Sequence, residues 1–454
     1  FLSGPQSRRD LLLGARQAVV DTTQRPAIRH QHDTANILLD KAVQTRDVFL
    51  LVGPPGTGKT SVGLVSLLQN ELANPQAHVL LAAFTNRAVD EICSKLVKEN
   101  LDFIRLGNSS SCHPDYKPYL LEQKVQSISK LEEVETLLRT SRICVGTTAS
   151  LASNTTLFKL NRFSLAIIDE ASQLLEPHLL PLLMAEHEGE LAIDRFVLIG
   201  DHKQLPAIVQ QSEEESRIDQ PALQAIELHN CRQSLFERFI KILPPTCIHW
   251  FTQHGRMHPE VADFANRHFY DHRLNPIPLP HQNEVANYDR MEFYPCRDTN
   301  ELHLSPKTNE PEAQLIAQLC LKHAQRIVAE GRPFSPDHTL GVIVPYRHQI
   351  ALIRRELSKL DFPHLDQISI DTVERFQGSE RDIIIYGFTV SKSSQLQFLC
   401  NSQFIDEDSV LIDRKLNVVL TRAKLRTIIV GNPDIIGRIP LFRSLIDHCQ
   451  PCTV

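Results

Sequence analysis

Residues 53–60 read Gly-Pro-Pro-Gly-Thr-Gly-Lys-Thr, and they directly follow the apolar run of residues 48–52. This is the pattern G-x-x-x-x-G-K-[ST], placed where a strand should end and a helix should begin. The glycines let the backbone turn tightly and direct its N–H groups at phosphate oxygens, and the next helix adds the positive end of its dipole. The stretch therefore predicts a phosphate-binding loop, which indicates nucleoside triphosphate hydrolysis.

The residues of this loop have separate expected roles. Lys59 can reach the β- and γ-phosphates of ATP, and the hydroxyl of Thr60 can hold Mg²⁺. A Gly-rich turn that arose by chance is disfavoured, because the strand-loop-helix context is present. We expect the nucleotide to be held by Gly53, Pro54, Pro55, Gly56, Thr57, Gly58, Lys59, Thr60 and Ser61.

Composition sets wide limits. A chain of 454 residues is too long for one ordinary domain. No apolar run approaches the roughly 18 residues that span a bilayer, so no membrane partner is expected. The net charge of −6 neither supports nor excludes nucleic acid, because a basic stripe can lie on an acidic body. Of ten cysteines only Cys449 and Cys452 form a C-x-x-C, which favours reduced thiols in a cytoplasmic or nuclear protein over a zinc site.

Strand-like apolar runs alternate with helical sequence in two series, which predicts an α/β fold of two domains with parallel sheets. The first series comprises residues 48–52, 79–83, 143–146, 165–168 and 196–199, and the second comprises 340–344, 383–386 and 427–430. We expect the break at Leu243-Pro-Pro-Thr246, giving domains 31–245 and 246–454. Residues 1–30 are expected to be a helical segment that ends an upstream region, since the chain opens with Phe1.

Three polar stretches are expected outside the sheets. Residues 107–140 are interpreted as a helical insertion in the first domain. Residues 276–311, rich in Pro and Asn, are expected to be a surface excursion, and residues 391–415 a long loop.

Two adjacent carboxylates follow a buried strand in Leu165-Ala-Ile-Ile-Asp-Glu-Ala-Ser-Gln173. The carboxyl end of a strand is the usual ligand edge of a parallel sheet. Asp169 suits the Mg²⁺ shell, and Glu170 is placed to orient and deprotonate the attacking water. An acidic pair that simply starts a helix is the alternative.

Another strand ends in Phe196-Val-Leu-Ile-Gly-Asp-His-Lys-Gln-Leu-Pro206. The neutral amide of Gln204 could sense the γ-phosphate and report its hydrolysis. The competing interpretation is an ordinary turn that Asp201 caps.

These segments resemble, in order, the motifs of superfamily 1 helicases, in the branch (superfamily 1B) that contains the nonsense-mediated-decay RNA helicase and the helicase-nuclease of Okazaki-fragment maturation. Further segments extend the resemblance over residues 31–432. They are Phe84-Thr-Asn-Arg-Ala-Val-Asp90, Val145-Gly-Thr-Thr-Ala-Ser150, Gly255-Arg-Met-His-Pro259, Val344-Pro-Tyr-Arg-His-Gln349, Asp371-Thr-Val-Glu-Arg-Phe-Gln-Gly-Ser-Glu-Arg-Asp382 and Leu416-Asn-Val-Val-Leu-Thr-Arg-Ala-Lys424.

The resemblance implies two tandem RecA-like domains with ATP in the cleft between them. It implies that Arg256 and Arg422 stabilise the transferring phosphoryl group and that Glu380 contacts the ribose. The family's adenine-reading glutamine has only a loose counterpart in Gln31, and its usual Tyr before Arg-Met-His-Pro is Gly255. A surface ion pair is the alternative for either arginine. His258 could be read as a catalytic base, but packing or capping is expected of it.

Single-stranded DNA or RNA is the partner that the resemblance implies, with a fused or associated nuclease or other N-terminal domains. Hydroxyls, amides and loop backbone can follow a sugar-phosphate chain without reading bases. The candidates are Thr85, Asn86, Thr148, Pro345, Tyr346 and Thr372. Each of these residues alone has an equally good explanation as a turn-former.

Three functions are compared, of which the third, a P-loop switch that acts on proteins alone, is the least favoured. The first is an ATP-driven helicase or translocase, and the resemblance implies movement from 5′ to 3′. The second is a nucleic-acid-stimulated ATPase clamp that does not unwind and serves a larger nuclease or defence assembly. A P-loop switch that acts on proteins alone would leave the motifs after residue 250 unexplained. Choosing between DNA and RNA depends on details of loop geometry.

Overall fold

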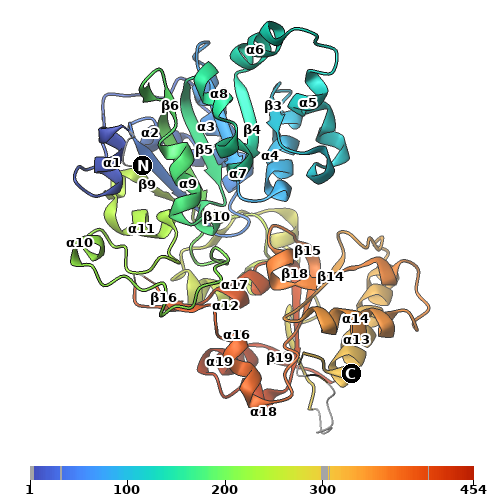
Figure 1. The fold of residues 1–454 in the computed structure, drawn as a ribbon. Coiled ribbons are helices and arrows are strands. Elements are labelled where there is room, and N and C mark those ends of the chain that lie inside the picture. Colours follow the sequence, from blue (N-terminus) through green and yellow to red (C-terminus); the bar gives the residue numbers. More distant parts are fainter. Residues whose placement is uncertain (1–4, 31–32, 298–304, 306, 407, 454) are drawn as a thin grey trace. The chain divides into compact units, whose positions relative to one another are not determined.

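The computed structural model describes residues 5–30, 33–297, 305, 307–406 and 408–453. The chain forms two compact units (Figure 1). Unit 1 comprises Phe1–Gly53, Gly58–His202 and Pro206–Phe251, and unit 2 comprises Pro54–Thr57, Lys203–Leu205 and Thr252–Val454. Each unit is an α/β body with a parallel sheet, so the predicted fold class is confirmed.

The sheet of unit 1 has seven parallel strands in the order β3-β4-β2-β5-β8-β1-β9. In that order they are Ile104–Leu106, Ile143–Thr147, Val79–Ala83, Phe163–Asp169, Ile193–Gly200, Val48–Val52 and Ile248–Trp250. The five strands expected in this part of the sequence are present. The short edge strands β3 and β9 were not expected.

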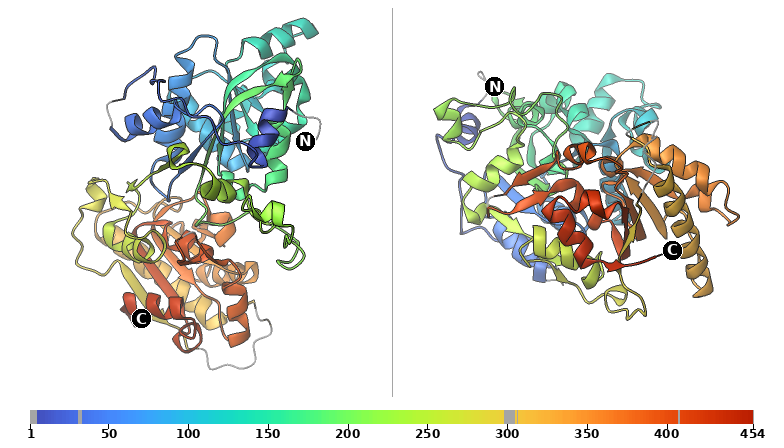
Figure 2. Two further views of the ribbon diagram at one scale, coloured as in Figure 1. Left: turned by 90° about the vertical axis from the view of Figure 1, so that its left-hand side faces the viewer. Right: turned by 90° about the horizontal axis from the view of Figure 1, so that it is seen from below.

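Helices cover both faces of this sheet, as Figure 2 shows from two further directions. Alternate residues of each strand point to opposite faces. On β1, Leu50 and Val52 pack into one core cluster, and Phe49 and Leu51 pack into a second. The first cluster includes residues of α7 (Thr148–Ser153), α9 (Glu176–Leu183) and α11 (Leu235–Ile242), and the second includes residues of α2 (Asp33–Ala42), α3 (Val65–Leu72) and α4 (Asn86–Lys98). This two-sided burial explains why the strands are apolar throughout rather than alternating.

In the described part of the chain, two helices of unit 1 precede β1 in sequence, and the others come after it. They are α1 (Gln6–Leu12), α2 (Asp33–Ala42), α3 (Val65–Leu72), α4 (Asn86–Lys98), α5 (Leu121–Lys124), α6 (Leu131–Thr140), α7 (Thr148–Ser153), α8 (Thr155–Leu160), α9 (Glu176–Leu183), α10 (Pro221–Gln224) and α11 (Leu235–Ile242). A π-helical turn, η1 (Lys59–Leu64), precedes α3, and a small hairpin joins β6 (Glu186–His187) to β7 (Glu190–Leu191). Residues 107–140 contain α5 and α6.

The sheet of unit 2 has six parallel strands in the order β14-β13-β15-β18-β12-β19. In that order they are Ser369–Thr372, Leu340–Val344, Arg381–Gly387, Ala423–Gly431, Met291–Pro295 and Gln450–Pro451. The expectation that residues 276–311 are only a surface excursion is wrong, because β12 is an interior strand. The buried Glu292 interrupts its apolar pattern, and an ion pair with Arg426 of β18 compensates that charge.

The helices of unit 2 are α12 (Pro259–Phe269), α13 (Glu310–Ala329), α14 (Arg347–Leu357), α15 (Val373–Phe376), α16 (Leu396–Leu399), α17 (Arg414–Leu420), α18 (Pro433–Ile436) and α19 (Pro440–His448). Another parallel pair, β10 (Gln253–His254) and β11 (Asn275–Pro276), lies outside the main sheet. Residues 391–415 are not a plain loop. They contain α16 and the antiparallel hairpin β16 (Gln403–Ile405) and β17 (Leu411–Asp413).

The chain leaves unit 1 after Phe251 rather than near Pro245. The reason is that β9 pairs with β1, and the amide of Phe251 donates to the carbonyl of Val52 at 2.8 Å. Assignment of the predicted ranges 1–30, 31–245 and 246–454 to functional domains stays a prediction. Among the described residues, none of the helices has the length and apolar character to cross a membrane.

Candidate nucleotide and nucleic-acid sites

The glycines of residues 53–60 adopt the conformations that a phosphate loop requires. Gly56 and Gly58 have φ angles of +74° and +81°, a region that disfavours residues with a Cβ. A Cβ on Gly56 would also overlap Arg256, and the amide of Gly255 donates to the carbonyl of Gly56 at 2.8 Å. Glycine is therefore required at position 56 by both conformation and space.

Lys59 and Thr60 start the π-helical turn η1 and lie at the carboxyl edge of the sheet of unit 1. The ammonium of Lys59 donates to the carbonyl of Gly53 at 2.5 Å. The hydroxyl of Thr60 donates to Oδ2 of Asp169 at 2.7 Å. Two residues that lie 109 positions apart and were both predicted to hold Mg²⁺ are thus in direct contact.

Asp169 ends β5 and is buried, and Glu170 follows it in a left-handed conformation with φ of +53°. Burial, and then the charge of Glu170, raise the pKa of Asp169 to about 7. Oε2 of Glu170 accepts a hydrogen bond from the side-chain Nε2 of Gln173 at 2.9 Å, which orients the carboxylate. Hard oxygen donors are the ligands that Mg²⁺ prefers, so Thr60, Asp169 and the glycine loop fit a magnesium-bound nucleotide.

In unit 2, Gln204 and Arg422 are brought together although 218 positions separate them. Nη2 of Arg422 donates to Oε1 of Gln204 at 2.9 Å, and Nε of Arg422 donates to the carbonyl of Val418 at 3.0 Å. Both side chains are buried, with 4% and 2% of their surfaces exposed. Burial makes a surface ion pair a poor explanation for Arg422.

Arg256 and Glu380 also meet. Nε of Arg256 donates to Oε2 of Glu380 at 2.6 Å, and the ammonium of Lys424 lies 2.8 Å from Oε1 of the same carboxylate. Burial opposes ionisation of Glu380, but the charges of Arg256 and Lys424 outweigh it and lower its pKa to about 2. Lys424 was not among the predicted site residues, although its position in the last motif was a signal that could have identified it.

The predicted residues of unit 2 lie at two opposite edges of its sheet. Glu380 and Arg422 immediately precede β15 and β18, at the amino ends of these strands. Pro345, Tyr346 and Thr372 lie at the carboxyl ends of β13 and β14. Since all strands are parallel, the nucleotide candidates and the nucleic-acid candidates of this unit are separated by the length of the strands.

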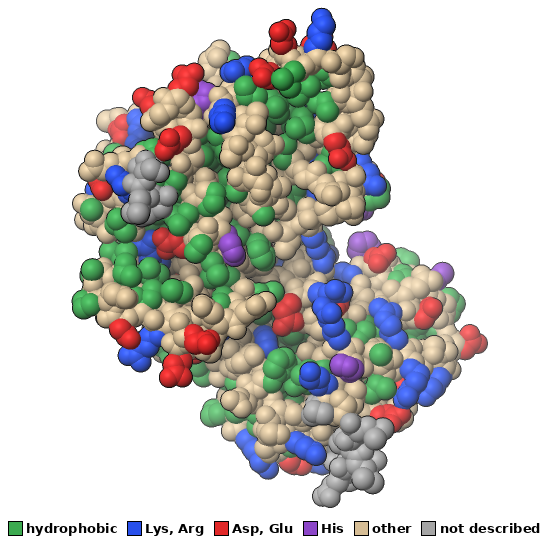
Figure 3. All heavy atoms as spheres, in the orientation of Figure 1, with side chains coloured by type: hydrophobic (Ala, Val, Ile, Leu, Met, Phe, Trp, Pro, Cys, Tyr) green, Lys and Arg blue, Asp and Glu red, His purple; other side chains and the backbone are tan. Residues whose placement is uncertain are grey.

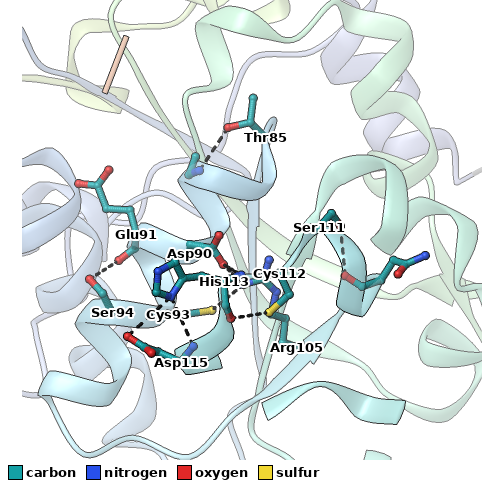
Figure 4. Close-up of polar contacts among 12 residues, drawn as sticks. Thr85, Asp90, Glu91, Cys93, Ser94, Arg105, Ser111, Cys112, His113 and Asp115 are labelled. Atoms are coloured by element: carbon teal, nitrogen blue, oxygen red, sulfur yellow. Dashed lines mark hydrogen bonds and ion pairs between the residues drawn. The ribbon is translucent and has the colours of Figure 1, made fainter. Parts of the chain in front are cut away.

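The nucleic-acid candidates of unit 1 lie at the carboxyl edge of its sheet. Thr85 caps α4 and accepts the amide of Ala88 at 3.2 Å, and Asn86 is the first residue of that helix (Figure 4). Thr148 begins α7 and is buried. The hydroxyl of Thr85 is thus used in helix capping, and a role of these residues in strand binding stays a prediction.

Figure 4 also shows Arg105 of β3 reaching Asp90 of α4, beside Cys93 and Cys112. This ion pair, in which Arg105 is buried, attaches α4 to the edge strand of the sheet. Asp90, the last residue of the segment Phe84–Asp90, therefore has a structural role.

In unit 2, Tyr346 stacks on Phe398 with ring centroids 5.0 Å apart, and the ammonium of Lys415 lies 4.1 Å from the Phe398 centroid. Tyr346 is buried, whereas Phe398 is 39% exposed. The stacking of Phe398 on Tyr346 was not predicted, because Phe398 lies in residues 391–415, which were interpreted as a loop. Figure 3 shows several Lys and Arg side chains on the visible face of unit 2, interspersed with Asp and Glu.

Two further expectations concern single residues. Gln31 lies outside the described residues. His258 caps α12, and its Nδ1 accepts the amide of Glu260 at 3.3 Å, so the expected capping role is confirmed.

Each unit has a parallel sheet with helices packed on it. The glycine loop, whose threonine contacts the aspartate at the end of β5, defines the chain as a P-loop α/β protein. Two family models, both described as AAA domain, match residues 21–212 (as 21–143 and 127–212) and residues 231–434. The chain belongs to this family, in the superfamily 1B helicase group that the motif order indicates.

Curated relatives are similar over most of the chain. The DNA replication ATP-dependent helicase/nuclease DNA2 of Gallus gallus is 30% identical over 418 residues, which cover 91% of this chain and 37% of the relative. Regulator of nonsense transcripts 1 of Caenorhabditis elegans is 28% identical over 459 residues, with 90% and 38% covered. The chain thus spans less than two fifths of the length of these relatives.

A solved structure, the arterivirus nonstructural protein 10 (helicase) in complex with DNA, aligns with a TM-score of 0.44 and 13% identity. The alignment covers 88% of this chain and 63% of that one.

Proposed function

We propose that this chain is the ATP-hydrolysing motor core of a helicase that moves along single-stranded nucleic acid in the 5′-to-3′ direction and separates duplexes. The contact of Thr60 with Asp169 carries the hydrolytic part of this proposal. The relative from Gallus gallus, whose name describes a DNA replication helicase/nuclease, supports the nucleic-acid part.

In the proposed reaction, Thr60 and Asp169 would hold Mg²⁺, which would supply positive charge to the phosphoryl oxygens. The backbone N–H groups of residues 53–60 and the ammonium of Lys59 bind the phosphates. Glu170, oriented by Gln173, accepts a proton from the attacking water. A carboxylate at this position suits that task because it is fixed before the water arrives.

Arg256 and Arg422 are proposed to stabilise the charge that develops on the transferring group, because a guanidinium is always charged and can hold phosphate bidentately. Gln204 is proposed to respond to the γ-phosphate through its hydrogen bond with Arg422. Glu380 is proposed to accept hydrogen bonds from the ribose, since its low pKa keeps it ionised.

The strand is proposed to contact Thr85, Asn86, Thr148, Pro345, Tyr346 and Thr372, mainly through phosphates. Each hydrolysis cycle would alternate the grip of the two units and advance the strand. We propose that the chain works inside the cell, alone or with a nuclease or another N-terminal domain.

The first test is steady-state ATP hydrolysis without nucleic acid, with single-stranded DNA and with single-stranded RNA. We expect one polymer to stimulate the rate, and Lys59→Ala to abolish it while the exposed Lys98→Ala leaves it unchanged. Hydrolysis that neither polymer changes would contradict the nucleic-acid part. Wild-type hydrolysis by Lys59→Ala would contradict the site itself.

A strand-displacement assay separates the two motor functions. Duplexes with either a 5′ or a 3′ single-stranded overhang are compared with ATP present. Unwinding from the 5′ overhang alone supports the proposed direction. Stimulated hydrolysis without any unwinding would favour the ATPase clamp.

A further inference from the structure

The hairpin β16–β17 carries a buried carboxylate that contacts the residue next to Gln204. Oδ2 of Asp406 lies 2.5 Å from the ammonium of Lys203, and the two side chains are 0% and 8% exposed. Both residues belong to unit 2. The pair joins positions 203 residues apart.

Asp406 is fixed by its own turn. Its Oδ1 accepts the amides of Asp408 and Val410 at 3.0 and 2.8 Å, while Oδ2 is directed at Lys203. The carboxylate therefore uses one oxygen to close the hairpin and the other to hold the ammonium. Because both oxygens are satisfied, the hairpin presents a preorganised partner to Lys203.

Lys203 is held at its backbone as well. Nδ2 of Asn417 donates to the carbonyl of Lys203 at 2.7 Å and to the hydroxyl oxygen of Tyr270 at 2.8 Å. Asn417 lies on α17, and this helix ends directly before Thr421 and Arg422. The residue before Gln204 is thus fixed at its side chain and at the peptide that leads into Gln204.

These contacts form a closed circuit around the two predicted catalytic residues. The circuit runs from Gln204 to Arg422, along α17 to Asp413, through the hairpin to Asp406, and back through Lys203. Asp413 completes it, because it ends β17 and caps α17 by accepting the amide of Leu416 at 2.9 Å. A displacement of the hairpin would therefore move Gln204 relative to Arg422.

A buried ion pair by itself is a poor source of stability, since apolar residues of similar volume often stabilise a protein as well or better. The effect of the pair is instead to fix the position of Lys203, the residue that precedes Gln204. We propose that Asp406 and Lys203 are positioning residues that hold Gln204 against Arg422 for hydrolysis, and that this role rests on the proposed ATPase function.

The decisive variant is Asp406→Asn. Its Oδ1 can still accept the two turn amides, but its Nδ2 is a donor and cannot accept from Lys203. We expect kcat for ATP hydrolysis to fall by about ten- to a hundredfold, because misplacement of about 1 Å in a catalytic group has effects of that size. KM for ATP and the affinity for a non-hydrolysable ATP analogue should change less than about threefold.

The matched control is Asp408→Asn in the same turn. The side chain of Asp408 is 45% exposed and lies 3.4 Å from Arg273, and only its backbone amide contacts Asp406. This variant should keep wild-type kcat, and circular dichroism should show that both variants fold.

A double-mutant cycle distinguishes positioning from general destabilisation. If Asp406 acts through Gln204, then Asp406→Asn should have no further effect on kcat in a Gln204→Ala background. Additive losses, or an unchanged kcat in Asp406→Asn alone, would overturn the proposal.

Amide hydrogen exchange supplies a readout that does not need activity. Peptides covering residues 201–206 should exchange faster in Asp406→Asn than in the wild type or Asp408→Asn. Unchanged exchange there would also overturn the proposal. If the wild-type chain hydrolyses no ATP, the proposed function itself is rejected. If the wild type and Asp406→Asn hydrolyse ATP at the same rate, only the positioning role is rejected.

Discussion

Glycine at position 56 is constrained twice, by its backbone conformation and by the neighbouring Arg256. An alanine there would adopt a left-handed φ at a cost of about 1 kcal/mol, and its Cβ would displace Arg256. We expect Gly56→Ala to weaken binding of a fluorescent ATP analogue at least about tenfold, measured by titration.

The control is Gly331→Ala, because Gly331 has a similar φ of +75° but no atom within 4 Å of an added Cβ. Its unfolding free energy should fall by about 1 kcal/mol while nucleotide affinity stays unchanged. Equal nucleotide affinity in both variants would show that the loop does not bind phosphate.

Glu170 is the residue best placed to accept the proton of the attacking water. Glu170→Gln keeps the size of the side chain but removes its basicity, so we expect kcat to fall about 10²- to 10⁴-fold. Affinity for the ATP analogue should remain within about threefold. The exposed Glu186→Gln serves as control, and a Glu170→Gln protein with near-normal kcat would assign the general base elsewhere.

At the scale of elements, Gln349 has a structural role that its motif did not indicate. Its side chain is fully buried, and it accepts the amide of Asn309 and donates to the carbonyl of Asn309, both at 2.8 Å. Asn309 in turn caps α13 by accepting the amide of Glu312 at 3.0 Å. Gln349 therefore fixes the start of the longest helix of unit 2.

Gln349→Leu would leave the N–H and C=O of Asn309 without these partners. An unsatisfied buried backbone group costs about 1–3 kcal/mol, so we expect unit 2 to lose about 3 kcal/mol of unfolding free energy in a urea titration. Gln325→Leu, on the exposed face of α13, should change it by less than about 0.5 kcal/mol. A loss below 1 kcal/mol in Gln349→Leu would contradict the capping role.

Elements differed in how well the sequence predicted them. The phosphate loop and the eight expected strands could be recognised because strands buried on both faces are apolar throughout. β12 was missed because Glu292 breaks its pattern, and the hairpin β16–β17 was missed because its sequence is polar and short. Both are stabilised by partners that are distant in the chain, namely Arg426 and Lys203.

At the scale of the whole molecule, buried histidines make the chain sensitive to acid. Burial, and then nearby positive charges, lower the pKa of His249 and His254 to about 4 and that of His323 to about 3. In the unfolded chain a histidine has a pKa of about 6.5. Between pH 6.5 and pH 4 the unfolded chain therefore binds more protons, so stability falls as pH falls.

Each such imidazole contributes at most about 1.4 kcal/mol per pH unit within this window. We expect the melting temperature to decrease steadily from pH 6.5 to pH 4.5 in a calorimetric series. His323→Gln, which cannot titrate, should reduce that slope, whereas the exposed His348→Gln should not. The same slope in both variants would show that His323 is not buried in its neutral form.

The sequence by itself determined the α/β class, the parallel strands, the phosphate loop and the order of the motifs, because each is written in a local pattern of apolar, glycine and carboxylate residues. It did not determine which side chains meet. Gln204 with Arg422, Glu380 with Arg256 and Lys424, and Lys203 with Asp406 are pairs that only the tertiary structure decided. Their members are far apart in the chain, and a contact of that kind depends on strand order and register, which no local pattern encodes.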